Sequence, residues 1–103
     1  MDFKSFVVGR NPKDGEAAIY VLEGPDGPGY VGSTAGRLNT RLRNHWRWTI
    51  GDRMLGWIRS LDGPPTLRVL MYVPRAETLQ WERTVLRAHV AEGYGLHNTR
   101  WMS

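Results

Sequence analysis

The stretch that decides the fold is EAAIYVLEGPDGPGYVGST, residues 16–34. Its first part, residues 16–24, is mainly apolar, and residues 29–34 form a second short run, so each predicts a β-strand. The intervening GPDGPG favours a tight turn, because Pro25 presets its φ angle and glycines accept positive φ. We therefore predict a hairpin.

The two tyrosines of this hairpin lie symmetrically about position 25. If the turn is centred there, Tyr20 and Tyr30 are cross-strand neighbours on one face of the sheet. Aromatic pairs of this kind are ordinary sheet packing. A phenol beside positive charge could instead act as a base, since the charge lowers a pKa that is otherwise about 10.

The rest of the chain predicts two helices, a third strand and a longer helix, over residues 37–50, 53–61, 66–74 and 76–92. A hairpin and one further strand need helices packed on them to be stable. We therefore predict an α+β domain, a small three-stranded antiparallel sheet flanked by helices, over residues 16–103. Residues 1–15 are predicted to form a loosely attached N-terminal lead-in, with a short extended piece at residues 6–8.

Composition limits the function classes. The chain has 103 residues, 41% of them hydrophobic, and no cysteine, which excludes disulfides, thiolate zinc sites and cysteine nucleophiles. No apolar run approaches the ~18 residues of a membrane span, and the N-terminal residues lack the apolar region of a signal peptide. We expect a cytoplasmic protein that has no membrane partner.

Positive charge is concentrated in one part of the chain. The formal net charge is +4, and Lys4 and Lys13 are the only lysines among the fourteen basic residues, so arginine supplies the others. The planar guanidinium group suits phosphate better than an ammonium does. Residues 37–59 include six arginines and a single acid, Asp52. This concentration of positive charge is typical of nucleic-acid binding.

One carboxylate falls on an apolar helix face. In the last predicted helix Glu82 lies near the middle of a stripe made by Leu79, Val85, Leu86, His89 and Val90. An unpaired buried charge costs several kcal/mol, so Glu82 needs a partner. Two interpretations stay open, a structural ion pair with an arginine or a site for a divalent cation.

The arginine-rich helix divides into two faces. Arg41 and His45 are four residues apart and share the edge next to Leu38 and Leu42, so they could face the same cleft as Glu82. Four other arginines could contact nucleic-acid backbone, or form only a solvated surface: Arg37, Arg43, Arg47 and Arg53.

The order of these motifs carries a resemblance. AIY at 18–20, YVG at 30–32, RLRNH at 41–45, WERTVL at 81–86 and HN at 97–98 together resemble the GIY-YIG nuclease family, over roughly residues 17–98. The chain departs from the family pattern at Ala18, where glycine is usual. It also lacks the lysine or histidine that often lies between the two middle helices, for which Arg53 could substitute.

The resemblance implies a catalytic site and a mechanism. Glu82 would hold one Mg²⁺ or Mn²⁺ ion, and Arg41 would bind the phosphate oxygens. Tyr20 would take the proton from the attacking water, directly or through His45. Tyr30 would position the phosphate or that water, and Asn98 would orient a neighbour. The expected products carry 5′-phosphate and 3′-hydroxyl ends.

Three functions are therefore compared. The first is a metal-dependent DNA endonuclease, in which loss of Arg41 abolishes cleavage while loss of Arg43 or Arg47 mainly weakens binding in a salt-dependent way. The second is a non-cleaving nucleic-acid-binding module derived from the nuclease fold. The third is a basic scaffold for an acidic protein. Selectivity for a DNA site could require a partner protein or a homodimer.

Overall fold

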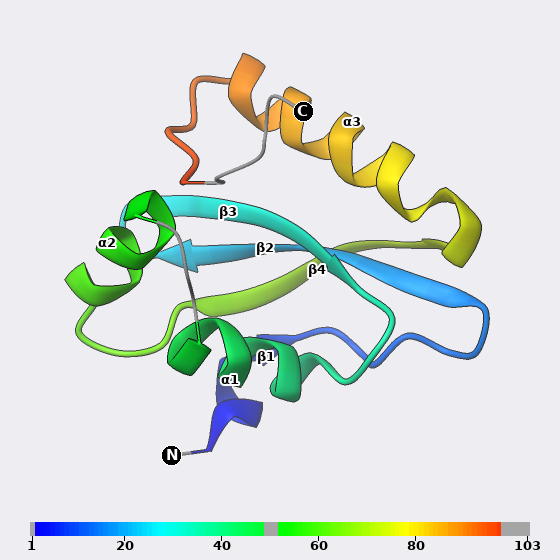
Figure 1. Cartoon of the computed structure of the whole chain (residues 1–103), viewed down its shortest axis with the longest axis horizontal. Helices are drawn as coiled ribbons and strands as arrows, with labels where there is room; N and C mark the ends of the chain where they lie inside the picture. The colour runs from blue at the N-terminus through cyan, green and yellow to red at the C-terminus, as the bar shows by residue number, and fades with distance from the viewer. Residues whose placement is uncertain (1, 49–51, 98–103) are drawn as a thin grey trace.

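The computed structural model describes residues 2–48 and 52–97. Across these ranges four strands and three α-helices follow one another along the chain, together with two short 3₁₀ segments (Figure 1). In chain order they are η1 (Phe3–Phe6), β1 (Val7–Val8), β2 (Glu16–Gly24), β3 (Gly27–Thr34), α1 (Leu38–Trp48), α2 (Asp52–Ser60), β4 (Thr66–Pro74), η2 (Arg75–Glu77) and α3 (Thr78–Ala91).

The strands form one mixed sheet in the order β1-β4-β2-β3. The central strand β2 pairs antiparallel with both β3 and β4, as predicted, whereas β1 is parallel to β4 through Val7 opposite Leu67 and Val8 opposite Arg68. The α+β class is confirmed. The prediction of a three-stranded antiparallel sheet was wrong, because β1 is a two-residue strand whose partner lies some sixty residues further along the chain.

The hairpin contains an irregularity that its sequence does not display. Close to the turn Gly24 pairs with Gly27, but the register shifts between Leu22 and Glu23, so that Leu22 pairs with Tyr30 and Tyr20 with Gly32. The prediction that Tyr20 and Tyr30 are cross-strand neighbours on one face is confirmed, but they are not directly opposite each other. The two tyrosines are instead diagonal neighbours on one face, with ring centroids 6.4 Å apart.

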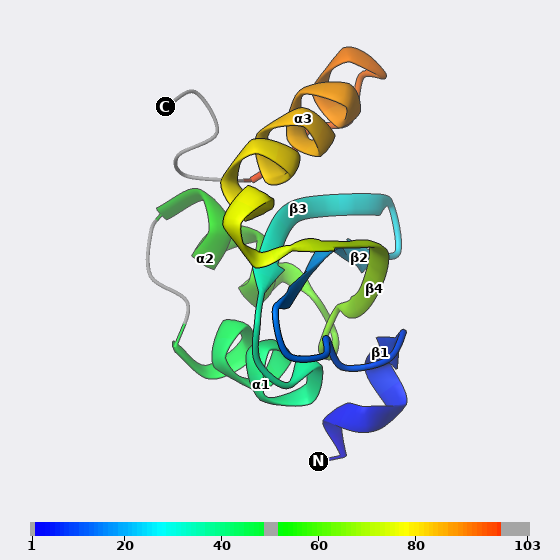
Figure 2. The same ribbon diagram turned by 90° about the vertical axis from the view of Figure 1, so that its right-hand side faces the viewer.

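Helices cover both faces of the sheet (Figure 2). One face packs against α1 and α2 through buried side chains that include Leu22, Leu38, Leu42 and Ile58. The other packs against α3 through Ile19, Val21, Val31, Val85 and Leu86. The predicted apolar stripe of α3 was wrong at Leu79, which is 58% exposed.

The N-terminal segment is attached to the domain by specific contacts. The backbone of Arg10 exchanges two hydrogen bonds with the hydroxyl of Tyr72, and the guanidinium lies over that ring. The side chain of Asn11 accepts a hydrogen bond from the backbone N–H of Leu38, at the start of α1. This bond satisfies one of the N–H groups that the first turn of a helix leaves without a partner. The segment thus fixes the position of α1, which carries part of the candidate site.

Within residues 2–48 and 52–97, no helix is long and apolar enough to cross a membrane.

Candidate functional site

The hydroxyl of Tyr20 lies at the centre of the candidate site. Tyr20 is in the middle of β2, and its side chain is 0% exposed. Its oxygen lies 2.6 Å from Nε2 of His45 and accepts a hydrogen bond of 3.0 Å from Nε of Arg41. Both partners come from α1, where their spacing of four residues places them one turn apart. The predicted inward edge of this helix is confirmed.

Tyr30 completes the aromatic part of this cluster. Its ring lies edge-on to the ring of His45, with centroids 4.9 Å apart and an interplanar angle of 63°. Gly32, opposite Tyr20, makes room for both phenols, since a Cβ atom there would lie 2.6 Å from the Tyr30 ring and 2.7 Å from the Tyr20 oxygen. The glycine of the YVG motif is therefore required by close packing within the site.

Burial determines the protonation states in the cluster. Burial, followed by the charge of Arg41, lowers the pKa of His45 to about 4. The pKa of Tyr20 is raised by its burial, which outweighs the opposing effect of Arg41. At neutral pH Tyr20 is thus a phenol and His45 is neutral, and the phenol donates to Nε2 in the tautomer whose proton is on Nδ1. The prediction that nearby positive charge lowers the phenol pKa gave the direction of one contribution only, because complete burial has the larger effect.

Arg41 keeps its charge in spite of being half-buried. Burial by itself would lower the pKa of its guanidinium, but attraction to Tyr20, Tyr30 and Glu82 outweighs it and raises that pKa. The side chain therefore presents a permanent cation beside the two phenols.

Glu82 approaches the cluster from α3, on the other face of the sheet. One of its oxygens accepts a 2.9 Å hydrogen bond from the hydroxyl of Ser33, on strand β3. Because β3 is an edge strand, the two sets of residues meet around that edge. Burial has the largest effect on the pKa values of Tyr20 and Tyr30, and the negative charge of Glu82 adds to the rise of both.

The structural ion pair considered for Glu82 is not formed within the described part of the chain. Two ion pairs occur there, Arg10 with Glu16 and Arg68 with Glu23. Glu82 is attracted to Arg41 without direct contact, and its hydrogen bond from Ser33 leaves the second carboxylate oxygen without a partner among these residues. A half-buried carboxylate in this state is open to a cation.

Ser33 is a site residue that sequence reasoning missed. It follows the YVG motif directly, and strand alternation turns it to the face opposite Gly32, toward α3. The alternation was readable from the sequence. The contact with Glu82 was not, because it joins positions 49 residues apart whose distance depends on how α3 packs on β3.

The oxygen ligands at Glu82 limit which metal could bind. Among the residues that the structure describes, no three His, Cys, Asp or Glu side chains gather at one point. One carboxylate and one hydroxyl would suit a hard cation that keeps most of its water ligands, as Mg²⁺ does. They would not suit zinc, which takes at least three protein ligands.

The other candidate residues divide into three groups. Arg43 and Arg47 are exposed on the outer side of α1, as predicted, and Arg37 is exposed just before this helix. Arg53 belongs to α2, but its side chain is not among those described. Asn98 lies outside the described residues.

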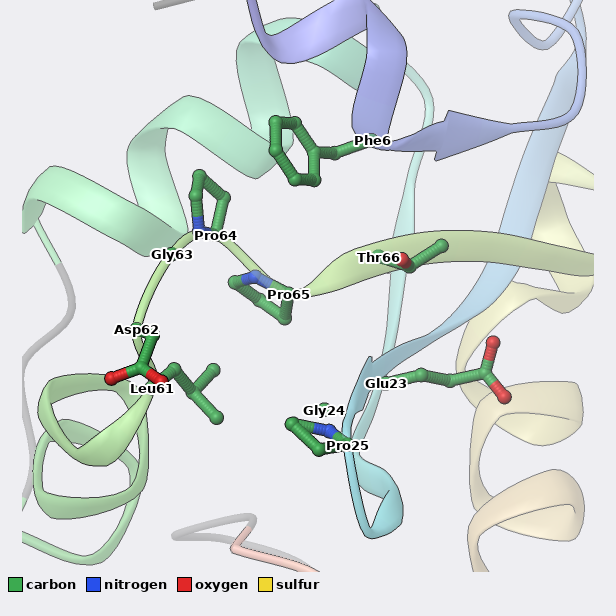
Figure 3. Close-up of a pocket in the computed structure, with 10 residues that line it drawn as sticks. All are labelled: Phe6, Glu23, Gly24, Pro25, Leu61, Asp62, Gly63, Pro64, Pro65 and Thr66. Carbon is green, nitrogen blue, oxygen red and sulfur yellow. The ribbon is translucent and has the colours of Figure 1, made fainter.

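A cleft of about 620 Å³ lies between the end of α2, η1 and the turn of the hairpin (Figure 3), and Tyr20, Arg41 and Glu82 are not among its lining residues. Apolar side chains form its walls, among them Phe6, Leu61 and Pro65, and no basic residue of the described ranges lines it. The carboxylate of Glu23 points away from the space and is paired with Arg68. This lining is not suited to phosphate.

Comparisons of the chain with family models, curated proteins and solved structures found no significant match.

Proposed function

We propose that this protein is a metal-dependent endonuclease that hydrolyses phosphodiester bonds in DNA and leaves 5′-phosphate and 3′-hydroxyl ends. The observation that supports this most strongly is the convergence of Tyr20, Arg41, His45 and Glu82, from β2, α1 and α3, around the edge of one strand. Such a set combines a phosphate ligand, a proton acceptor and a carboxylate, which are the groups that phosphodiester hydrolysis needs.

In this proposal Arg41 binds the phosphate that is attacked. Its guanidinium is charged and half-buried; its Nε donates to Tyr20, and the guanidinium also interacts with the hydroxyl of Tyr30. The terminal N–H groups that Tyr30 does not take can donate to the non-bridging oxygens, where they stabilise the negative charge that develops as water adds to phosphorus.

The proton would move along the existing hydrogen bonds. As the water oxygen bonds to phosphorus, its proton passes to the oxygen of Tyr20, and the phenol proton passes to Nε2 of His45, 2.6 Å away. Movement of Arg41 from Tyr20 toward the phosphate frees the phenol oxygen to accept. The bond between phosphorus and the 3′ oxygen then breaks, and that oxygen takes a proton from solvent.

Glu82 would hold the metal, oriented by the hydrogen bond from Ser33. A Mg²⁺ or Mn²⁺ ion there supplies stabilisation of charge on the phosphate and on the leaving oxygen. Tyr30, beside His45, would position the phosphate.

The direct test is incubation of the protein with supercoiled plasmid and Mg²⁺. We expect relaxed and then linear DNA, with no conversion when a chelator is added. End-labelling of the products identifies 5′-phosphate and 3′-hydroxyl termini. Intact plasmid in the presence of Mg²⁺ and Mn²⁺ would reject the proposal.

One observation favours a second function, a nucleic-acid-binding module that does not cleave. Tyr20 is 0% exposed, so water does not reach its oxygen unless the site rearranges. This alternative predicts that the protein retards DNA in a gel equally with and without metal, and that it leaves the DNA intact.

A further inference from the structure

A second cleft, of about 370 Å³, lies at the N-terminal end of α1. It is formed jointly by the N-terminal segment and by residues 37–39, and its polar lining comes from Lys4, Arg10, Asn11, Arg37 and Asn39. Among the residues that the structure describes, no acidic side chain lines it. In this respect it differs from the apolar cleft of Figure 3.

The positive charge of this basic cleft comes from two of its three cations. Arg10 donates to both carboxylate oxygens of Glu16, at 2.9 and 3.3 Å, so its charge is balanced. Lys4 and Arg37 are exposed, and neither forms an ion pair with any residue of the described ranges. The nearest acid on the same segment as Lys4 is Asp2, whose carboxylate accepts from the Lys4 backbone. Lys4 and Arg37 can therefore neutralise an added anion.

The basic cleft adjoins the candidate catalytic site. The backbone N–H of Arg41 donates to the carbonyl of Arg37, so these two arginines are one helical turn apart. Side chains at this spacing are neighbours, with Cβ atoms about 5–6 Å apart. A nucleic-acid strand carries a phosphate every ~3.4 Å of helix axis. A strand with one phosphate at Arg41 therefore has its next phosphates within reach of the basic cleft.

We propose that the basic cleft binds a backbone phosphate of the DNA strand, adjacent to the phosphate held by Arg41. The assignment of Arg41 rests on the proposed function. Side chains provide the contact, since the Leu38 N–H at the start of α1 is already bonded to Asn11. The pairing of β1 with β4 and the bonds of Arg10 to Tyr72 hold the segment in place before DNA arrives. Little ordering is then needed on binding.

The test compares two double variants with the same loss of charge. Lys4→Gln/Arg37→Gln alters the basic cleft, and Arg75→Gln/Arg87→Gln alters exposed arginines of η2 and α3. Binding of a labelled oligonucleotide is followed by fluorescence anisotropy with chelator present and at several salt concentrations. We expect the cleft variant to raise the Kd about tenfold and to lower the salt slope by about 0.7–0.9, the value for one phosphate contact.

The control pair is expected to change the Kd less than threefold. Oligonucleotides with one uncharged methylphosphonate then locate the contact. Wild type should bind more weakly when the methylphosphonate replaces the phosphate next to the cleaved linkage. The affinity of the cleft variant should not change with the same replacement. Equal losses in the cleft and control variants would overturn the proposal.

Other outcomes separate this proposal from the endonuclease proposal. DNA affinity that depends on the basic cleft, in a protein that leaves plasmid intact, would support the cleft and reject the nuclease. Plasmid cleavage together with identical Kd values for the two double variants would support the nuclease and reject the cleft. If the cleft variant loses binding of inorganic pyrophosphate but keeps its affinity for DNA, the ligand is a free anion and the proposal is wrong.

Discussion

At the residue scale, the hydroxyl of Tyr20 connects Arg41 and His45, the groups of α1 that the proposed mechanism uses. It accepts from Arg41 and lies within 2.6 Å of Nε2 of His45, although the side chain is completely buried. A buried hydroxyl with two such partners contributes to stability, and in the proposed mechanism also to catalysis, because its removal breaks the hydrogen bond with each of them.

The substitution Tyr20→Phe should separate these two contributions. We expect plasmid cleavage to fall by at least ~100-fold, since the proton path is lost, while the free energy of unfolding falls by about 1–2 kcal/mol. Urea denaturation and plasmid nicking measure the two effects. Tyr94→Phe is the matched control, because Tyr94 is an exposed residue beyond α3, outside the candidate site and the basic cleft, and its substitution should leave cleavage unchanged.

His45 should make stability depend on pH in the acidic range. Its pKa is about 4 in the folded protein and about 6.5 in the unfolded chain. Between these values the unfolded state binds the proton and the folded state does not, so the free energy of unfolding decreases as the pH falls from 6.5 toward 4.

The full loss from this group is roughly 3 kcal/mol. Urea denaturation at pH values from 7.5 to 4 should therefore show a steeper decline for wild type than for His45→Gln. Parallel curves for the two proteins would mean that His45 is not held neutral by the fold.

Helical spacing alone predicted which α1 side chains share the inner edge, since Arg41 and His45 are one turn apart. It could not predict that the pKa of Tyr20 is raised, because the depth of a strand residue depends on α1 packing across it. Ser33 was missed for a similar reason, as its partner Glu82 belongs to a distant helix.

At the element scale, the register shift in the hairpin brings the two tyrosines to one face. With the pairing found at the turn, Tyr20 would lie opposite Val31, and Tyr30 would point to the other side of the sheet. Leu22 pairs with Tyr30 and Glu23 with Pro28, so β3 has one extra residue between these two partners. This extra residue restores the alternation of faces, as a β-bulge does. The ends of β2 and β4 were predicted correctly from their composition. The register shift could not be predicted in this way, because no residue type in the hairpin marks its position.

The substitution Gly32→Ala should damage this arrangement directly. Its Cβ would meet the Tyr30 ring and the Tyr20 oxygen at 2.6 and 2.7 Å, so both rings must move. We expect the free energy of unfolding to fall by about 1–3 kcal/mol. The rate of cleavage should fall by a larger factor than the fraction of folded protein does.

Gly56→Ala is the control for this substitution. Gly56 is an exposed residue of α2 with open space at its Cβ position, so alanine should stabilise the helix by about 0.5–1 kcal/mol. If the Gly32→Ala variant cleaves DNA at the wild-type rate, the spacing of the two phenols is unimportant for cleavage.

At the scale of the whole molecule, the N-terminal segment has more importance than its composition indicated. The sequence predicted a loosely attached lead-in with an extended piece at residues 6–8. The extended piece is confirmed, but the loose attachment was wrong, because Val7–Val8 pairs with β4, Asn11 caps α1, and Lys4 lines the basic cleft. A parallel pair of two residues cannot be found from periodicity, because it is shorter than any repeat that periodicity measures.

The whole arrangement places a carboxylate, a phenol–imidazole pair and a charged guanidinium around the edge of β3, with the basic cleft next to them on α1. The central claim is that this edge hydrolyses DNA with a metal at Glu82. Glu82→Gln removes the charge that would hold the metal, and Glu92→Gln removes the same charge at an exposed residue beyond α3.

The most direct measurement is the rate of plasmid nicking in Mg²⁺ by wild type and by these two variants. The account predicts that Glu82→Gln is inactive and that Glu92→Gln nicks at the wild-type rate. Nicking by Glu82→Gln as fast as by wild type would contradict it.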